Sequence, residues 1–319
     1  MSHLLNPAQR EAIRYLDGPL LVLAGAGSGK TRVITQKIAY LIEECAMPPD
    51  TIAAITFTNK AAREMDERVK TLLAGRPTKG LTISTFHSLG MRLLRAEAKA
   101  AGYKPGFSIF DSDDSYAIVA DLSGSVDKKT IRRLQATISN WKNAGLTPDQ
   151  AAAEAVSEAD GLAARAYRNY DATLKSYQAV DFDDLIRLPL QLLEENAEVR
   201  ERWQNRLRYL LVDEYQDTNG LQYRMLKALA GPRAQFTAVG DDDQAIYAWR
   251  GADVENLKHL TQDFPQLKVV KLEQNYRSTL RILEAANTLI ANNPKLFEKR
   301  LWSEHGQGDP ITLTACKDA

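Results

Sequence analysis

The chain has 319 residues, enough for two domains that each bury a hydrophobic core. It carries 41 lysines and arginines against 41 aspartates and glutamates, so its formal net charge is zero. No overall basic field attracts a polyanion, and a nucleic-acid site must be a local arrangement of charges and aromatic rings. Cys45 and Cys316 lie far apart and indicate neither a disulfide framework nor a metal cluster. The absence of a secretory signal and of a bilayer-spanning apolar run predicts a cytoplasmic protein without a membrane partner.

A glycine-rich turn follows the first predicted strand. Residues 20–23 are apolar and predict a buried strand, and apolar residues at helical spacing from 34 to 42 predict the helix that follows. The turn between them is a phosphate-binding loop, built from Ala24, Gly25, Ala26, Gly27, Ser28, Gly29, Lys30 and Thr31. Its glycines let backbone N–H groups approach phosphate oxygens, and the N-terminus of the helix adds positive partial charge. Lys30 suits the terminal phosphates and Thr31 suits Mg²⁺, while Ala24 stands where the usual pattern has glycine.

A short helix precedes this strand, with Asn6 as its cap and Pro7 at its first position. Gln9 lies on that helix. Its side-chain amide both donates and accepts hydrogen bonds, which suits an adenine edge. A solvated helix glutamine is the alternative interpretation.

Strands and helices alternate in the first part of the chain. Residues 51–57 and 81–87 predict two further strands that each run into a helix, so the sequence predicts an α/β fold with a parallel sheet. Ligands bind at the carboxyl ends of such strands. Phe57, Asn59, Thr85 and His87 all fall there, although polar helix caps also belong at these positions.

The character of the chain changes between residues 90 and 200. This segment is mainly helical, without strand–helix alternation, and predicts a helical domain inserted into the sheet domain. We expect Trp141 to pack in its core. The acidic stretch Asp181-Phe-Asp-Asp-Leu185 predicts the capped start of a helix rather than a metal site.

The sheet resumes after this insertion. Residues 209–212 form an apolar strand that ends in Asp213 and Glu214, the Walker B arrangement of a P-loop protein. Asp213 is then placed to hold Mg²⁺, and Glu214 to orient or deprotonate the attacking water. Surface acids that merely follow a strand are the alternative.

A polar loop with aromatic side chains follows the next strand, residues 236–240. Gln244 lies in the loop, and Tyr247, Trp249 and Arg250 come directly after it. Two aromatic rings beside an arginine suit stacking on unpaired bases, although such rings also serve in protein cores. Residues 267–272 predict one more strand, and Ser278 is the expected cap of the helix after it.

Taken in order, these blocks resemble the superfamily 1 DNA helicases of the UvrD, Rep and PcrA type. The resemblance is carried by residues 5–9, 24–31, 55–63, 83–87, 212–217, 239–252 and 272–278. It covers the whole chain, but the chain matches only the first half of such a helicase. The implied fold is a RecA-like P-loop NTPase sheet, formed by residues 1–89 and 201–271, with an inserted helical domain at 90–200. Residues 272–319 then begin a second RecA-like domain, which is cut short.

The resemblance also implies roles for individual residues. The nucleotide-binding set is the phosphate loop 24–31 with Gln9, Arg32, Tyr276 and Arg277. Lys30, Gln244 and Arg277 surround the γ-phosphate, Thr31 and Asp213 hold Mg²⁺, and Glu214 serves the water. Phe57, Tyr247 and Trp249 stack bases of single-stranded DNA, with Asn59, Thr85, His87 and Arg250 alongside.

The implied activity is ATP-dependent 3′-to-5′ translocation and duplex unwinding in replication or repair, with ATP and Mg²⁺ as cofactors. Single-stranded DNA, duplex junctions and replication or repair proteins are the implied partners. Because the second domain is incomplete, residues 1–319 alone are expected to unwind nothing. Three alternatives remain open: a helicase–nuclease subunit of the RecB/AddA kind, an ATP-dependent anti-recombinase, and a P-loop binding module without a nucleic-acid role.

Overall fold

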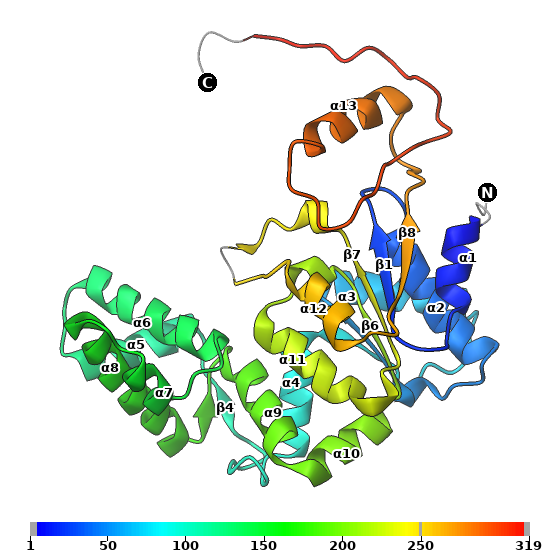
Figure 1. The fold of residues 1–319 in the computed structure, drawn as a ribbon. Coiled ribbons are helices and arrows are strands. Elements are labelled where there is room, and N and C mark those ends of the chain that lie inside the picture. Colours follow the sequence, from blue (N-terminus) through cyan, green and yellow to red (C-terminus); the bar gives the residue numbers. More distant parts are fainter. Residues whose placement is uncertain (1–4, 249–250, 316–319) are drawn as a thin grey trace. The chain divides into compact units, whose positions relative to one another are not determined.

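The computed structural model describes residues 5–248 and 251–315, which form two compact units (Figure 1). The first unit comprises Met1–Ile83, Arg208–Thr218 and Pro232–Ala319, and the second comprises Ser84–Leu207 and Asn219–Gly231. These divisions differ from the boundaries expected from sequence, because residues 219–231 group with the helical segment and residues 272–319 group with the sheet. A second RecA-like domain beginning at residue 272 stays a prediction. In the described part of the chain, no helix is both long and apolar enough to cross a membrane.

A six-stranded sheet forms the centre of the first unit, in the order β3-β2-β6-β7-β1-β8. Its strands are β1 (Leu20–Ala24), β2 (Ile52–Thr56), β3 (Thr82–Thr85), β6 (Tyr209–Val212), β7 (Phe236–Gly240) and β8 (Lys268–Leu272). The pairings of β1 with β7 and β8, and of β6 with β2 and β7, are all parallel. The predicted α/β fold with a parallel sheet is therefore confirmed.

The register of the sheet brings the predicted functional loops to one edge. Leu23 of β1 pairs with Gly240 at the end of β7, and Ala24 pairs with Leu272 at the end of β8. The same carboxyl edge continues through β6 and β2, since Val212 pairs with Ile55. β1 is fully buried, as expected for a central strand covered on both faces.

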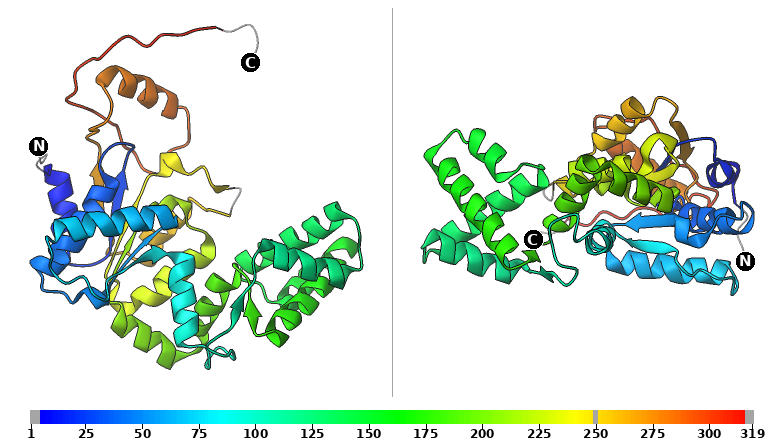
Figure 2. Two further views of the ribbon diagram at one scale, coloured as in Figure 1. Left: turned by 180° about the vertical axis from the view of Figure 1, so that it is seen from behind. Right: turned by 90° about the horizontal axis from the view of Figure 1, so that it is seen from below.

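Helices cover both faces of this sheet (Figure 2). The first unit contributes α1 (Pro7–Arg14), α2 (Lys30–Glu43), α3 (Asn59–Leu72) and α12 (Asn256–Asp263) to this cover. Its remaining described helix, α13 (Leu280–Ile290), lies beyond the end of β8 (Figure 1). α2 and α3 pack side by side, and α12 lies on the opposite face. Short 3₁₀ turns lie at Pro49–Thr51, Tyr215–Asp217, Gly231–Arg233 and Asp242–Gln244.

The start of α13 corrects one expectation. Ser278 does not cap this helix, because its backbone N–H donates to Asn275 Oδ1 at 2.7 Å and closes a turn before the helix begins. The N-cap residue is Thr279, with extended backbone angles. A hydrogen-bonded asparagine turn therefore moves the start of the helix by one residue.

The second unit is mainly helical, as the sequence predicted. Its helices are α4 (Phe86–Ala96), α5 (Ser112–Ser123), α6 (Lys128–Asn143), α7 (Pro148–Ala153), α8 (Glu158–Ser176), α9 (Asp184–Glu195), α10 (Ala197–Arg206) and α11 (Gly220–Ala230). Two short strands, β4 (Ser108–Ile109) and β5 (Ala179–Val180), pair in parallel and were not predicted. Trp141 is half-buried and stacks on Tyr167 at 6.2 Å between ring centroids, in agreement with a packing role.

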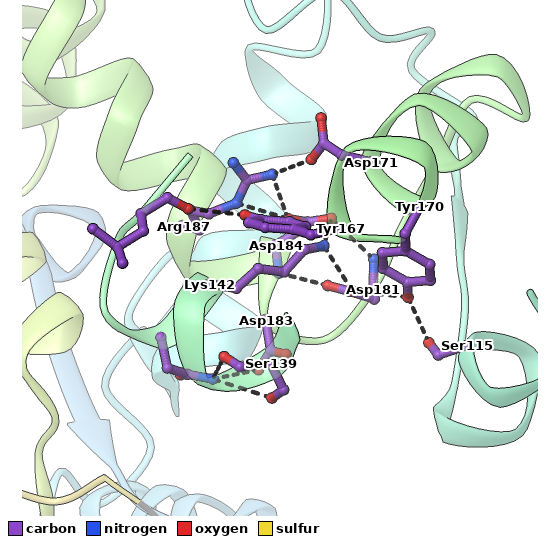
Figure 3. Close-up of polar contacts among 12 residues, drawn as sticks. Ser115, Ser139, Lys142, Tyr167, Tyr170, Asp171, Asp181, Asp183, Asp184 and Arg187 are labelled. Atoms are coloured by element: carbon purple, nitrogen blue, oxygen red, sulfur yellow. Dashed lines mark hydrogen bonds and ion pairs between the residues drawn. The ribbon is translucent and has the colours of Figure 1, made fainter. Parts of the chain in front are cut away.

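A buried charge cluster joins α6, α8 and α9, and Figure 3 shows its contacts. Lys142 Nζ lies 2.7 Å from Asp181 Oδ2 and 2.9 Å from Asp184 Oδ2. Arg187 in turn contacts Asp184 and Asp171. Asp181 does accept a hydrogen bond from the backbone of Asp184, so part of the capping prediction holds. The prediction did not include the ion pairs that Asp181 and Asp184 make with Lys142, a buried lysine on α6.

Candidate functional site

The phosphate loop is a tight turn between β1 and α2. Gly27 and Gly29 have φ values of +70° and +91°, a region that side-chain-bearing residues rarely adopt. Ser28 is fully buried, and its hydroxyl donates to the Gly25 carbonyl at 2.7 Å. Gly29 is also the N-cap residue of α2, so the helix begins at Lys30 with its first N–H groups facing the loop. This is the geometry that a phosphate requires.

The two residues expected at adenine lie beside this loop. Gln9 is fully buried, and its Nε2 donates to the Ser28 carbonyl at 3.0 Å. Tyr276 donates its backbone N–H to the Gly27 carbonyl at 2.9 Å. Asn6 joins them, because it caps the helix that carries Gln9 and donates to the Tyr276 hydroxyl at 2.9 Å. The structure thus shows both residues bracing the phosphate loop, and their contact with adenine stays a prediction.

The two acids after β6 have distinct environments. Asp213 is buried, whereas the side chain of Glu214 is 36% exposed and its Oε2 lies 3.4 Å from Lys30 Nζ. Glu214 adopts a left-handed backbone conformation (φ +49°, ψ +47°), which is uncommon for a glutamate and typical of functional sites. Burial, and then the nearby Glu214 carboxylate, raise the pKa of Asp213 to about 7.

An open pocket of about 510 Å³ lies over these acids. Its lining includes Thr31, Thr56, Phe57, Asp213, Glu214, Gln216, Asp217, Gln244 and Tyr247. Asp217 Oδ1 and Thr56 Oγ1 are buried there without a protein hydrogen-bond partner. These two atoms and the buried Asp213 carboxylate make a set of oxygen atoms that the protein itself leaves partly unsatisfied. A hard divalent cation such as Mg²⁺ fits this donor set. Thr31 and Asp213 line the same pocket, and their binding of Mg²⁺ stays a prediction.

A hydrogen-bond chain connects the acids to the loop after β7. The side-chain amide of Gln216 donates to Glu214 Oε2 at 2.9 Å, and its oxygen accepts the Asp241 backbone N–H at 3.0 Å. The side-chain amide of Gln244 in turn donates to Asp241. Sequence reasoning assigned no role to Gln216, although it stands in the acidic block that carries the Walker B pair.

The expected DNA-contacting residues are only partly brought together. The rings of Phe57 and Tyr247 stack with centroids 5.2 Å apart and an interplanar angle of 25°. Asn59 begins α3 and is exposed two residues beyond Phe57. Trp249 and Arg250 lie outside the described residues. This stacked aromatic pair lines the same pocket as Asp213 and Glu214.

Thr85 and His87 belong to the second unit, except that Thr85 also ends β3. Thr85 caps α4 through a hydrogen bond from the Ser88 backbone N–H. His87 makes an edge contact with Phe182 at 6.4 Å between ring centroids, and burial lowers its pKa. Their contact with DNA stays a prediction.

A parallel sheet that carries a phosphate loop after β1 and an Asp-Glu pair after β6 defines a P-loop NTPase. More narrowly, the chain belongs to the UvrD/Rep helicase family. Residues 5–265 match the UvrD/REP helicase N-terminal domain, and residues 270–319 match the UvrD-like helicase C-terminal domain.

Individual relatives agree with this assignment. The chain is 59% identical to the ATP-dependent DNA helicase Rep of Escherichia coli (strain K12), over 98% of this chain and 47% of Rep. It is 45% identical to the ATP-dependent DNA helicase PcrA of Staphylococcus epidermidis (strain ATCC 12228), over 96% of this chain and 42% of PcrA. The chain thus spans about half the length of the curated relatives that it matches.

Proposed function

We propose that this chain forms the nucleotide-binding and single-stranded-DNA-binding part of an ATP-dependent DNA helicase. One observation carries the proposal. A single pocket in the first unit holds Thr31, Asp213, Glu214 and Gln244 and is also lined by the stacked rings of Phe57 and Tyr247. The residues proposed for nucleotide chemistry and the aromatic pair proposed for base stacking therefore line the same pocket.

Each side of the pocket has a defined task. The phosphate loop with Lys30 binds the β- and γ-phosphates of ATP, and Gln9, Arg32, Tyr276 and Arg277 complete the nucleotide site. Thr31 and Asp213 hold Mg²⁺, which neutralises phosphate charge when it is bound. Glu214 orients the attacking water, and the 3.4 Å contact of its carboxylate with Lys30 Nζ supports this role.

DNA is held mainly through its bases. Phe57 and Tyr247 offer an aromatic surface on which unpaired bases stack. The family resemblance adds Asn59, Thr85, His87, Trp249 and Arg250 as further residues that contact DNA. Because the net charge of the chain is zero, phosphate contacts are few and the salt dependence of binding is modest. The direction of movement, 3′ to 5′, and a role in replication or repair follow from the family.

The test measures how tightly the protein binds a labelled oligothymidine as single-stranded DNA. Binding is followed by fluorescence anisotropy with and without Mg²⁺ and a non-hydrolysable ATP analogue. Phe57→Ala is expected to weaken binding about ten-fold, since base–aromatic stacking contributes ~1–3 kcal/mol per base. The matched control is Tyr177→Ala, an exposed aromatic residue of the second unit that is far from the phosphate loop in sequence.

A folded Phe57→Ala protein with the parent's DNA affinity contradicts the DNA assignment. A parent chain that binds the analogue but no DNA favours the alternative of a nucleotide-gated binding module.

A further inference from the structure

The ammonium group of Lys299 lies among the three carboxylates of an acidic loop. The loop after β7 carries Asp241, Asp242 and Asp243, whose carboxylate oxygens gather within 4.8 Å of one another. The Lys299 side chain is 5% exposed, and its ammonium pairs with Asp241 and Asp242 and lies 2.9 Å from Asp243 Oδ2. Three carboxylates this close repel one another strongly unless a cation separates them. A lysine from a distant part of the sequence supplies that cation.

The segment that carries Lys299 is fastened to the phosphate-loop side of the unit. The Trp302 backbone N–H donates to the Glu273 carbonyl at 3.0 Å, and the Asn275 N–H donates to the Trp302 carbonyl at 2.8 Å. Leu301 packs directly on the phosphate loop, because a Cβ atom placed on Gly25 lies 2.2 Å from its Cδ2. Lys299 is thus held by a strand-like segment in contact with the nucleotide site.

Asp241 is shared between Lys299 and Gln244. Its carboxylate forms an ion pair with the ammonium of Lys299 and accepts a hydrogen bond from the side-chain amide of Gln244. Its backbone N–H donates to the side-chain oxygen of Gln216. If Gln244 turns to a γ-phosphate, it must leave Asp241. A buried carboxylate that loses its partner costs free energy, but here Lys299 remains to satisfy it.

We propose that Lys299 is a positioning residue that couples the nucleotide site to the DNA site. It rests on the proposed function of this pocket. The Lys299 ammonium holds the loop 241–244 in place and stays paired with the Asp241 carboxylate. The Gln244 amide can therefore leave Asp241 and donate its hydrogen bond to the γ-phosphate instead. Tyr247 follows Gln244 by three residues, and a displacement of the loop reaches the aromatic pair directly. Without Lys299 the repulsion between its carboxylates displaces the loop, and the affinity for DNA no longer depends on whether nucleotide is bound.

The coupling is measured as the ratio of single-stranded DNA affinities with and without the Mg²⁺-bound ATP analogue. Lys299→Met removes the charge and keeps the length of the side chain. We expect it to reduce the parent's ratio about five-fold or more, at the low end of allosteric couplings. Lys299→Arg keeps the charge and restores at least half of the lost coupling. Lys295→Met, at an exposed lysine four residues earlier, is the matched control and leaves the ratio unchanged.

Hydrogen exchange gives an independent measure that needs no DNA. Backbone amides of residues 241–248 are expected to exchange about ten-fold faster in Lys299→Met than in the parent or in Lys295→Met, because the loop has lost its central cation. If Lys299→Met does not fold, Lys299→Gln is measured in its place.

The outcomes separate the two proposals. Parent-like coupling or parent-like exchange in folded Lys299→Met overturns the role of Lys299 and leaves the proposed function intact. If the parent chain binds DNA equally well with and without the ATP analogue, the two sites are not coupled, and the proposed role of Lys299 is overturned as well.

Discussion

Lys30 and Glu214 lie 3.4 Å apart, yet the proposed function assigns them to different parts of the reaction. Lys30 contacts phosphate in the ground state, so Lys30→Ala should abolish nucleotide binding or hydrolysis. Glu214 acts on the water, so Glu214→Gln should keep nucleotide affinity and slow hydrolysis by about 10²–10⁴, the usual contribution of a general base. Nucleotide affinity from a fluorescent ATP analogue and single-turnover hydrolysis separate the two effects.

The control for this pair is Glu67→Gln, which removes the same charge from an exposed position on α3. It is expected to bind and hydrolyse ATP as the parent does. Hydrolysis at the parent rate by Glu214→Gln means that another group activates the water. Asp217, which lines the same pocket and has a pKa raised to about 6, chiefly by burial, is then the next candidate.

Residues whose role depends on their immediate neighbours in sequence could be predicted; those that act through distant contacts could not. The phosphate loop and the Asp213–Glu214 pair follow from short patterns next to apolar strands. Gln216 and Lys299 have no such pattern, since Gln216 links Glu214 to the Asp241 backbone 25 residues away and Lys299 pairs with Asp242 at a separation of 57 residues. The left-handed backbone of Glu214 likewise follows from the fold rather than from its residue type.

At the scale of elements, the cluster around Lys142 makes a strong stability prediction. Lys142→Met leaves Asp181 and Asp184 buried side by side with only Arg187 to neutralise them. Breaking a buried pair by removing one partner typically costs about 3–5 kcal/mol. We expect a loss of that size in the free energy of unfolding, measured by urea denaturation of the second unit.

A second substitution tests the cause of that loss. Adding Asp181→Asn to Lys142→Met removes the stranded charge, while Arg187 still pairs with Asp184. The double variant should therefore recover a large part of the lost stability. If it is no more stable than Lys142→Met, lost packing rather than uncompensated charge explains the defect.

The contact between α1 and α2 predicts a pH dependence of stability. Lys37 on α2 is fully buried, and its amine donates to the carbonyls of Ala12 and Tyr15, both at 2.7 Å. Burial lowers its pKa to about 7 from the ordinary value of 10.5. Between these values the unfolded chain binds more protons than the folded one, so this residue makes stability rise with pH by up to about 1.4 kcal/mol per unit.

The measurement compares the parent with Lys37→Met in urea at several pH values between 7 and 10. Other titrating groups affect both proteins alike, and the difference isolates Lys37. The unfolding free energy of the parent minus that of the variant should increase with pH. A difference that stays constant across this range contradicts a neutral Lys37 in the folded state.

Sequence periodicity predicted the larger elements because buried strands and amphipathic helices each have a recognisable spacing. All six strands of the main sheet were expected, β6 and β7 with their exact ends and the other four with at least one end that differs by one or two residues. The strands β4 and β5 were missed because each has only two residues, too few to show a pattern. The start of α13 was misplaced because the Asn275 side chain captures the Ser278 backbone before the helix begins.

At the scale of the whole molecule, the proposed function makes residues 1–319 one wall of a nucleotide site. In that proposal they provide the phosphate loop, the Mg²⁺ ligands, the water-orienting glutamate and the γ-phosphate residues Gln244 and Arg277. The family implies an opposing wall from a complete second RecA-like domain, with a further arginine at the γ-phosphate. Such an arginine contributes about 10³–10⁵ to turnover because it neutralises charge that develops in the transition state. Translocation also needs two domains that close and open around ATP, so that one grips DNA while the other moves.

We therefore expect residues 1–319 to bind Mg-ATP and single-stranded DNA weakly, to hydrolyse ATP at a small fraction of a complete helicase's rate and to unwind nothing. The test compares DNA-stimulated ATPase and strand separation of this chain with those of E. coli Rep at matched salt. Strand separation by this chain alone contradicts the requirement for two complete domains. Near-normal ATPase without unwinding contradicts only the arginine argument, because hydrolysis then needs no opposing wall while movement along DNA still does.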